Sequence, residues 1–298
     1  MSDKTILHML TPLKHMSPFD VNMAADAGFD VLSSYTNVTA SEVAGLVQDA
    51  IFSRPPKRGV KTGLFIGGKD AIVALDMLKA AKKAFVPPFA ISLFADPAGS
   101  FTTAAAMVAR VERLLRVQYD RGLKGAKVLV FGATGVVGFS SAVIAALEGA
   151  DVTLVGYDGP VRVERLSAEI EARFDVTTRF ADGSDDEKKE KLLLGAEIVL
   201  SAGKAGVQVL SADLVRSADS LLIAADVNAV PPAGIEGLAP TANGEKIGNS
   251  KALGLGALTI GGVKYQTQSG LFKQMLKAEK PVVYDFRDAF VLARTLVQ

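Results

Sequence analysis

Three glycines between an apolar run and a helix-forming run are the residues of this sequence best placed to do chemistry. The run at 127–131 is rich in β-branched and aromatic residues, as in a buried strand, and residues 139–148 are rich in Ala, Val, Ile and Leu. Gly132, Gly135 and Gly138 lie between them. In a dinucleotide-binding βαβ unit, the first glycine permits a tight turn, the second lets the backbone approach a pyrophosphate, and the third allows close helix–strand packing. The stretch therefore predicts a nucleotide-binding turn.

The spacing of these glycines is a variant of the common Gly-x-Gly-x-x-Gly pattern, with the second glycine one place later. Unpaired N–H groups at the start of a helix bind phosphate groups. We therefore expect the turn and the first residues of the helix to hold the cofactor. The residues assigned to this role are Gly132, Thr134, Gly135, Val136, Val137 and Gly138.

An acidic residue follows the next predicted strand. Asp158 comes after the apolar run at 151–155, about 20 residues beyond the last glycine, where a carboxylate would accept hydrogen bonds from ribose hydroxyls. This placement favours NAD, because a carboxylate repels a 2′-phosphate. Arg162 and Arg165 follow closely, and their positive charge would weaken the preference for NAD over NADP. We therefore assign Arg162 to the cofactor site and expect NADP to be accepted too. The alternative is that Asp158 only caps the following helix.

Two later strand ends are suited to the nicotinamide half of the cofactor. Ser201, Ala202 and Gly203 are small enough to let a nicotinamide ring lie against the backbone. Asn228, beyond the next strand, is predicted to hydrogen-bond the carboxamide of that ring. An ordinary turn at 226–232 is the alternative for Asn228.

The sequence is short of acid–base catalysts. It has no cysteine, which excludes disulfides and thiolate sites, and only two histidines, so we predict no metal site. The nucleotide-binding half also lacks a Tyr-x-x-x-Lys pair. Oxidising an alcohol requires a base, whereas hydride loss from a carbon between two nitrogens requires mainly that donor and acceptor be held together. The composition is compatible with the second chemistry without establishing it.

The overall composition is that of an ordinary globular protein. Of the 298 residues, 49% are hydrophobic and 22% are charged, with a formal net charge of +1. Such a balance gives no reason to expect nucleic acid or an anionic membrane as a partner. The sequence also lacks a signal-peptide pattern and an apolar run of about 18 residues. We expect a soluble, cytoplasmic protein.

Strand-like and helix-like segments alternate along the chain, which predicts an α/β fold with mainly parallel sheets. Strands are expected near 5–11, 30–35, 63–67, 89–94, 127–131, 151–155, 198–201 and 221–226, and helices near 17–27, 39–52, 70–85, 101–119, 162–174 and 265–278. We predict a Rossmann-type dinucleotide-binding domain at 123–251. Residues 1–122 and the returning tail 252–298 are predicted to form a discontinuous α/β substrate domain.

Four segments resemble the methylene-tetrahydromethanopterin dehydrogenases of methylotrophic bacteria. They are residues 14–20 (KHMSPFD), 94–105 (FADPAGSFTTAA), 226–234 (DVNAVPPAG) and 261–266 (GGVKYQ). The resemblance is continuous along nearly the whole chain and is far more specific than the glycine pattern. It is to the branch that accepts NAD as well as NADP, since the NADP-restricted relatives tend to carry Arg or Lys where this chain has Tyr157-Asp158.

The resemblance implies a cytoplasmic homo-oligomeric enzyme of formaldehyde oxidation. It would transfer a hydride from the methylene carbon of methylene-tetrahydromethanopterin, its one-carbon carrier, to NAD or NADP, giving the methenyl cation. The pterin is expected in a cleft between the domains. Lys264 would position the pterin, and Asp20 would hydrogen-bond it or balance its positive charge. The residues assigned to substrate binding are Phe19, Thr102, Thr103 and Phe272, with a place in the core as the alternative for each phenylalanine.

Three other functions remain open from the residues themselves. The same hydride transfer on methylene-tetrahydrofolate differs only in the carrier. A non-catalytic NAD-binding sensor would need the nucleotide site alone. An ordinary alcohol or hydroxy-acid dehydrogenase is disfavoured by the missing base.

Overall fold

A computed structural model describes residues 4–298, which form two compact units. One unit comprises residues up to 102 together with 265–292, and the other comprises 103–264 together with 293–298. The divisions lie at 102/103 and 264/265, whereas we expected them at 122/123 and 251/252. The difference arises partly because two short strands after residue 242 pair into the second sheet. Within residues 4–298, no helix is long and apolar enough to cross a membrane.

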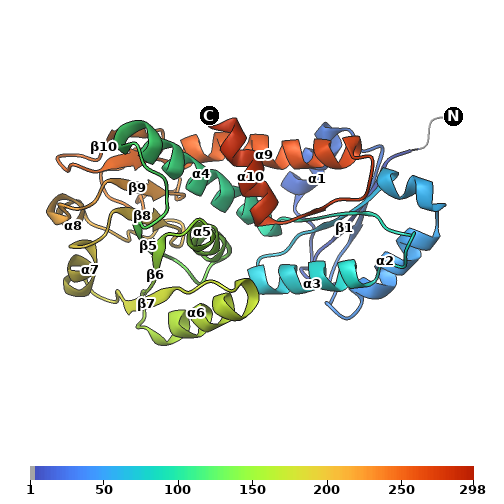
Figure 1. Cartoon of the computed structure of the whole chain (residues 1–298), viewed down its shortest axis with the longest axis horizontal. Coiled ribbons are helices and arrows are strands. Elements are labelled where there is room, and N and C mark those ends of the chain that lie inside the picture. Colours follow the sequence, from blue (N-terminus) through green and yellow to red (C-terminus); the bar gives the residue numbers. More distant parts are fainter. Residues whose placement is uncertain (1–3) are drawn as a thin grey trace. The chain divides into compact units, whose positions relative to one another are not determined.

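The first unit is built on a five-stranded sheet in which every paired strand is parallel. Its strands, in spatial order, are β12 (Val283–Tyr284), β4 (Ser92–Ala95), β3 (Thr62–Ile66), β1 (Ile6–Leu10) and β2 (Val31–Tyr35). Helix α1 (Pro18–Ala27) and the second part of α9 (Ala257–Lys277) cover one face, and α2 (Val43–Phe52) and α3 (Ala71–Lys83) cover the other (Figure 1). Short 3-10 segments occupy Pro56–Lys61 and Pro97–Gly99.

The ends of α1 follow directly from the residues there. The Ser17 hydroxyl accepts a hydrogen bond from the Asp20 N–H, and Pro18 occupies the first helical position, where no N–H is needed. Gly28 ends the helix in the left-handed region at φ +111°, which favours glycine. This N-terminal cap fixes Asp20 in the first turn of the helix.

Four aromatic rings form the centre of the first unit. Phe272 of α9 is fully buried, and its ring centroid lies 5.1 Å from that of Phe94, 5.5 Å from that of Phe65 and 6.2 Å from that of Phe29. Such edge and tilted contacts add to the stabilisation from burying the rings. Phe272, predicted to bind substrate, is instead part of the core, because its whole surface is covered by other side chains.

Helix α9 begins at Ala257 and not at the predicted Tyr265. Gly261 and Gly262 lower helix propensity by roughly 1 kcal/mol each relative to alanine, so the sequence there resembles a loop. Ile260, Val263 and Leu271 nevertheless recur at helical spacing and are almost fully buried. Burial of this apolar face offsets the glycine penalty.

The second unit contains a seven-stranded sheet with the strand order of a dinucleotide-binding fold. In spatial order its strands are β10 (Asn243–Lys246), β11 (Leu253–Leu255), β9 (Ile223–Asp226), β8 (Ile198–Ser201), β5 (Lys127–Phe131), β6 (Asp151–Gly156) and β7 (Arg179–Asp182). Only the β10–β11 pair is antiparallel. Counted from β5, the six parallel strands follow the order 3-2-1-4-5-6, which confirms the predicted Rossmann-type fold.

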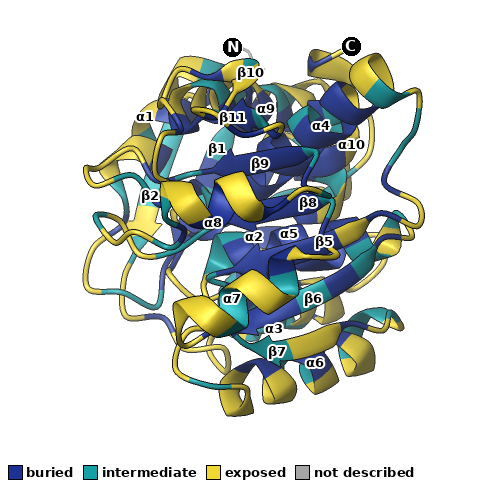
Figure 2. Ribbon diagram, turned by 90° about the vertical axis from the view of Figure 1, so that its left-hand side faces the viewer, coloured by how far each residue is buried: buried dark blue, intermediate teal, exposed yellow. Residues whose placement is uncertain are grey.

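Helices cover both faces of this second sheet. They are α5 (Val136–Leu147), α6 (Val161–Phe174), α7 (Asp186–Leu193) and α8 (Ala212–Ser217). Leu129, Phe131 and Val199 pack with Leu193 of α7 and Leu214 of α8 in one buried cluster. The strands are largely buried, whereas the outer faces of α6, α7 and α8 are exposed (Figure 2). Parallel strands buried on both faces explain the continuous apolar runs of the sequence.

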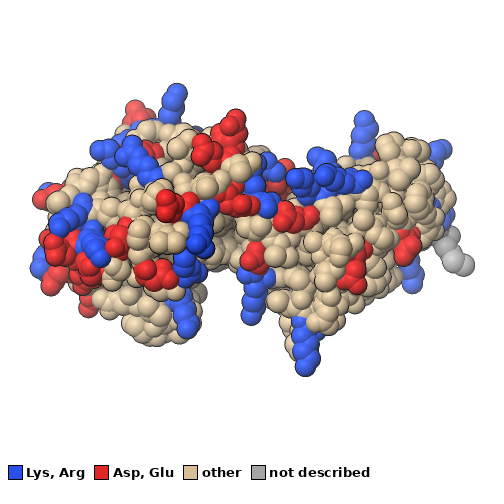
Figure 3. Space-filling model, turned by 90° about the horizontal axis from the view of Figure 1, so that it is seen from below, with Lys and Arg blue, Asp and Glu red and all other residues tan. Residues whose placement is uncertain are grey.

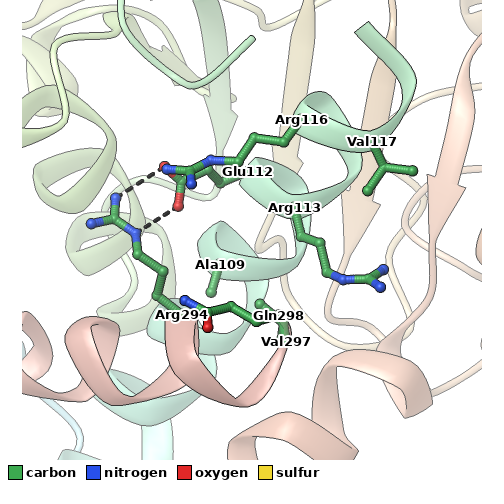
Figure 4. Close-up of a pocket in the computed structure, with 8 residues that line it drawn as sticks. All are labelled: Ala109, Glu112, Arg113, Arg116, Val117, Arg294, Val297 and Gln298. Atoms are coloured by element: carbon green, nitrogen blue, oxygen red, sulfur yellow. Dashed lines mark hydrogen bonds and ion pairs between the residues drawn. The ribbon is translucent and has the colours of Figure 1, made fainter. Parts of the chain in front are cut away.

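An ion-pair network joins α4 (Ser100–Tyr119) to the end of α10 (Phe286–Leu296) within the second unit. The nearly buried carboxylate of Glu112 accepts hydrogen bonds from Arg294 Nε at 2.7 Å and from Arg116 at 2.8 Å (Figure 4). Arg294 also pairs with Glu148 of the α5 C-terminus.

A cavity of about 220 Å³ lies beside this network. The one side-chain carboxylate in its lining, that of Glu112, already accepts hydrogen bonds from two arginines. The network stabilises the C-terminal residues on this unit.

Charged residues of both signs are interspersed on the face drawn in Figure 3, in keeping with a net charge of +1. Many are paired locally along helices, such as Lys191 with Glu187 in α7. Pairs this exposed contribute little to stability.

We predict that Phe272→Ala destabilises the first unit by about 3–5 kcal/mol, because it leaves a cavity among three other rings. The matched control is Phe52→Ala, since Phe52 lies in the same unit with 54% of its surface exposed and loses far less buried area. Urea unfolding followed by circular dichroism measures both. An unchanged midpoint for Phe272→Ala would contradict its place in the core.

Candidate functional site

The glycine turn after β5 is closely packed against the end of β8. Gly132 adopts φ +73°, and a Cβ there would collide with the carbonyl oxygen of Ala202 and lie 2.8 Å from the Gly203 N. A Cβ at Gly138 would collide with the Gly132 carbonyl. A Cβ at Gly135 would come no closer than 3.4 Å, to the Gly132 oxygen. Gly132 and Gly138 are therefore required by the fold, whereas Gly135 is not.

Helix α5 begins at Val136, immediately after this turn, with Gly135 as its N-cap. No side chain caps this end, so the first N–H groups of the helix have no such partner in the described chain. Thr134 and Gly135 are exposed at the tip of the turn, and Val136 and Val137 are partly exposed. An uncapped helix start next to exposed backbone fits the pyrophosphate of a dinucleotide.

The predicted ribose residue, Asp158, lies in the loop between β6 and α6. Its Oδ2 accepts a hydrogen bond from Arg162 Nη1 at 3.2 Å, and the same nitrogen donates to the Tyr157 hydroxyl at 3.0 Å. Asp158 does not cap the helix: Pro160 is the N-cap of α6, and no side chain caps it. The capping alternative for Asp158 is therefore wrong.

The small residues after β8 lie beside the glycine turn. Ser201 is fully buried and pairs in register with Asp226 of β9, whereas Ala202 and Gly203 are partly exposed. The backbone N–H of Ala202 donates to the Phe131 carbonyl at the end of β5. Of these predicted cofactor residues, Ala202 and Gly203 are therefore accessible to a ligand, whereas Ser201 is part of the buried strand that precedes them.

Asn228 has its side-chain amide engaged with the protein backbone. Its Oδ1 accepts from the Val230 N–H at 2.9 Å and from the Gly206 N–H at 3.4 Å, while Nδ2 donates to the Pro232 carbonyl at 3.0 Å. The side chain thus joins the loop after β8 to the loop after β9. In this arrangement Asn228 shapes the loops beside the predicted nicotinamide position, where we expected it to bind the carboxamide directly.

The sequence did not single out Asp226, which supports the same loops. Its buried carboxylate accepts hydrogen bonds from the Asn228 N–H at 3.1 Å and the Ile235 N–H at 3.2 Å. Burial raises the pKa of this carboxyl, although the N–H donors act in the opposite direction. A Cβ on Gly234 would lie 2.8 Å from both carboxylate oxygens, so this residue must be glycine.

In the first unit, Asp20 and a glutamine from α9 form a buried polar pair. Asp20 is 1% exposed, and its Oδ1 accepts a hydrogen bond from Gln268 Nε2 at 2.8 Å. Gln268 was not predicted, yet it lies one helical turn after the partly exposed Lys264, and residues four apart share a helix face. That spacing is the signal in the sequence that could have identified Gln268.

The remaining predicted substrate residues differ in exposure. Phe19 is 47% exposed, and Thr103 is partly exposed. Thr102 is fully buried, and its hydroxyl lies 2.7 Å from Asp96 Oδ2 and 3.1 Å from the Gly99 carbonyl. Asp96 also accepts the Phe101 N–H, so Thr102 and Asp96 together fix the start of α4. Thr102 presents no surface to a ligand here, in contrast to our expectation.

No group of three or more His, Asp or Glu side chains with a metal-binding arrangement occurs within residues 4–298. The polar clusters at the strand ends described above are instead held by N–H donors and guanidinium groups.

We predict that alanine substitutions at the turn glycines separate stability from cofactor binding. Gly138→Ala should lower the melting temperature, since its Cβ collides with backbone. Gly135→Ala should leave the melting temperature nearly unchanged and weaken NADH binding about tenfold or more, because its Cβ would occupy the space of the pyrophosphate. Differential scanning fluorimetry and calorimetric titration with NADH measure the two effects. Unchanged affinity in Gly135→Ala would place the pyrophosphate elsewhere.

Comparison with known proteins identifies the family. A family model described as methylene-tetrahydromethanopterin dehydrogenase, N-terminal, matches residues 18–98. The chain is 54% identical over 290 residues to the NAD(P)-dependent methylenetetrahydromethanopterin dehydrogenase of Methylorubrum extorquens, covering 97% of this chain and 98% of that protein. It is 34% identical over 280 residues to the bifunctional protein MdtA of the same organism, covering 94% of each.

A solved structure shares the fold at low sequence identity. Quinate dehydrogenase from Corynebacterium glutamicum, determined in complex with NAD, superposes with a TM-score of 0.55 and 14% identity, covering 98% of this chain and 99% of that chain. At this identity the likeness concerns the fold alone. The sequence identity over nearly the whole length is decisive: the chain belongs to the family of NAD(P)-dependent methylenetetrahydromethanopterin dehydrogenases.

Proposed function

We propose that this protein transfers a hydride from the methylene carbon of methylene-tetrahydromethanopterin to NAD or NADP. The products are the methenyl cation of the pterin and the reduced nucleotide, so two electrons and one proton leave the methylene carbon together. The 54% identity over 97% of the chain to a dehydrogenase of this name carries the proposal.

The nucleotide-binding residues support the cofactor half of this proposal. When bound, the oxidised nicotinamide supplies the carbon that accepts the hydride. The exposed turn at Thr134 and Gly135 and the uncapped start of α5 would hold the pyrophosphate. Ala202 and Gly203, partly exposed at the end of β8, would lie against the nicotinamide, with Asn228 and Asp226 fixing the loops around them.

The reaction itself asks little of acid–base groups. The two nitrogens flanking the methylene carbon delocalise the positive charge that forms, so no side chain needs to remove a proton. The protein contributes mainly by positioning, which accounts for much of the rate enhancement in such reactions. A carboxylate near the developing cation lowers the barrier further.

Two residues carry the substrate half of the proposal. The Asp20 carboxylate is held in place by Gln268 and is 1% exposed, so it would balance the positive charge of the methenyl product through space and without direct contact. Lys264 would position the pterin, with Phe19 and Thr103 as further contacts. The family relationship and the matching segments at 14–20 and 261–266 support these roles.

We further propose that the protein works in the cytoplasm as a homo-oligomer, in the oxidation of formaldehyde carried on tetrahydromethanopterin. The resemblance of the segments at 14–20, 94–105, 226–234 and 261–266 to the methylene-tetrahydromethanopterin dehydrogenases of methylotrophic bacteria supports this setting.

The direct test mixes the purified protein with methylene-tetrahydromethanopterin and follows the absorbance of reduced nicotinamide, once with NAD and once with NADP. We expect turnover with both nucleotides. Parallel reactions with methylene-tetrahydrofolate provide the comparison, and faster turnover on folate would contradict the proposed carrier. Tight NAD binding without turnover on either carrier would favour a sensor.

We predict that Lys264→Ala lowers kcat/KM for the pterin by more than tenfold, equivalent to about 1.4 kcal/mol of transition-state stabilisation. Steady-state kinetics with saturating NAD measure the change. Lys273→Ala is the matched control, because Lys273 is an exposed lysine of the same helix. Kinetics close to those of the control would remove Lys264 from the substrate site.

A further inference from the structure

The loop between β6 and α6 carries two opposite charges where the adenosine ribose of a dinucleotide is expected. Asp158 and Arg162 form an ion pair at 3.2 Å, and Arg162 also donates to the Tyr157 hydroxyl. Arg162 Nη2 lies 3.5 Å from Thr134 Oγ1, in the glycine turn after β5. Arg162 therefore spans from the ribose loop to the edge of the phosphate-binding turn.

The ion pair between Asp158 and Arg162 is weak enough to exchange. The two side chains are 40% and 51% exposed. Exposed pairs of this kind contribute about 0–1 kcal/mol, because water screens them and ordering two side chains costs entropy. A phosphate accepts the same charge-assisted and frequently bidentate hydrogen bonds from a guanidinium as a carboxylate does, so the exchange replaces one such bond with another. A bound phosphate can therefore displace the carboxylate at small cost.

The neutral partners of Arg162 do not depend on Asp158. The guanidinium carbon lies 5.7 Å from the centre of the Tyr157 ring, in addition to the hydrogen bond to its hydroxyl. Hydrogen bonds to Asp158 and then Tyr157 raise the pKa of Arg162, and an arginine guanidinium stays charged in a protein with or without them. Tyr157 can thus keep the cation over the loop after the carboxylate has separated from it.

The backbone of this loop is closely packed at its glycines, and the exchange described below needs movement of side chains only. A Cβ on Gly156 would collide with the Gly159 carbonyl, and Gly159 itself adopts φ +103°. Asp158 makes no helix cap, so its carboxylate can change partner without disturbing the start of α6.

We propose that Asp158 and Arg162 are an exchangeable pair through which one site accepts both NAD and NADP. With NAD, the Asp158 carboxylate accepts the ribose hydroxyls and remains beside Arg162. With NADP, the 2′-phosphate replaces Asp158 as the anion on Arg162, and Asp158 turns toward solvent. This inference rests on the proposed function and assigns its cofactor choice to two side chains.

Arg165, which we expected from the sequence to favour NADP together with Arg162, provides an internal control on the same helix because it lacks the contacts of Arg162. It is exposed on α6 three residues after Arg162 and makes no hydrogen bond or ion pair in the part of the chain that the structure describes. Removing Arg165 changes the net charge of the unit by the same amount as removing Arg162. A difference between the two variants therefore reports local contact and not overall charge.

The test measures the dissociation constants of NADH and NADPH by calorimetric titration without pterin, which keeps it independent of hydride transfer. Arg162→Ala should weaken NADPH about tenfold or more and leave NADH within about threefold. Asp158→Asn should weaken NADH and leave NADPH unchanged or tighter. Arg162→Lys should keep part of the NADPH affinity, since it retains the charge without the planar fork. Arg165→Ala should leave the NADPH-to-NADH ratio unchanged.

Salt dependence gives a second measurement on the same variants. Added salt should weaken the binding of NADPH more than that of NADH in the unmodified protein and have little effect on the ratio of the two dissociation constants in Arg162→Ala. The inference is overturned if Arg162→Ala weakens both nucleotides equally, leaves both unchanged, or matches Arg165→Ala. Failure of the unmodified protein to bind either nucleotide would overturn the proposed function instead. Melting temperatures within a few degrees of the parent confirm that each variant is folded.

Discussion

The close contact between Gly132 and the backbone at Ala202 is the constraint on which the nucleotide-binding unit depends. Gly132 follows β5 and Ala202 follows β8, the neighbouring strands at which the strand order reverses. Only glycine fits there, because any side chain would strike the Ala202 carbonyl. The turn can then pass directly into α5, whose uncapped first N–H groups suit a phosphate. The contact between Gly132 and Ala202 thus places the phosphate-binding start of α5 at the point where the strand order reverses.

The polar residues at the strand ends mostly accept hydrogen bonds from backbone N–H groups of the loops around the candidate ligand site. Asp226 and Asn228 accept N–H groups from two loops, and Asp96 accepts those at the start of α4. Each is buried, where a carboxylate or amide is stable only with its hydrogen bonds made. A reaction that needs no base depends on geometry, so residues that hold loops still contribute to the rate without touching the reacting atoms.

The regular part of this fold could be predicted because local patterns determine it. Apolar runs bounded by glycine or proline identified the central strands, and the glycine turn located the nucleotide-binding unit. The edges could not be predicted in this way. Strand β12 has two residues, too few for any periodicity, and β7 is partly exposed and carries charged residues at both ends. Such strands form because the edge of a sheet is available for pairing, and the local sequence pattern contains no signal for that.

The candidate site was harder to predict, because the same residue types serve structure and binding at a strand end. Asn228 and Asp158 were assigned to the cofactor on similar grounds, yet their environments differ. Asn228 is 7% exposed and its amide is engaged with three backbone groups. Asp158 is exposed, caps no helix, and pairs with one exposed arginine. Breaking the first set of contacts leaves buried N–H groups unsatisfied, whereas breaking the second exchanges one solvated anion for another. Of the two, Asp158 is therefore the residue that a ligand can recruit.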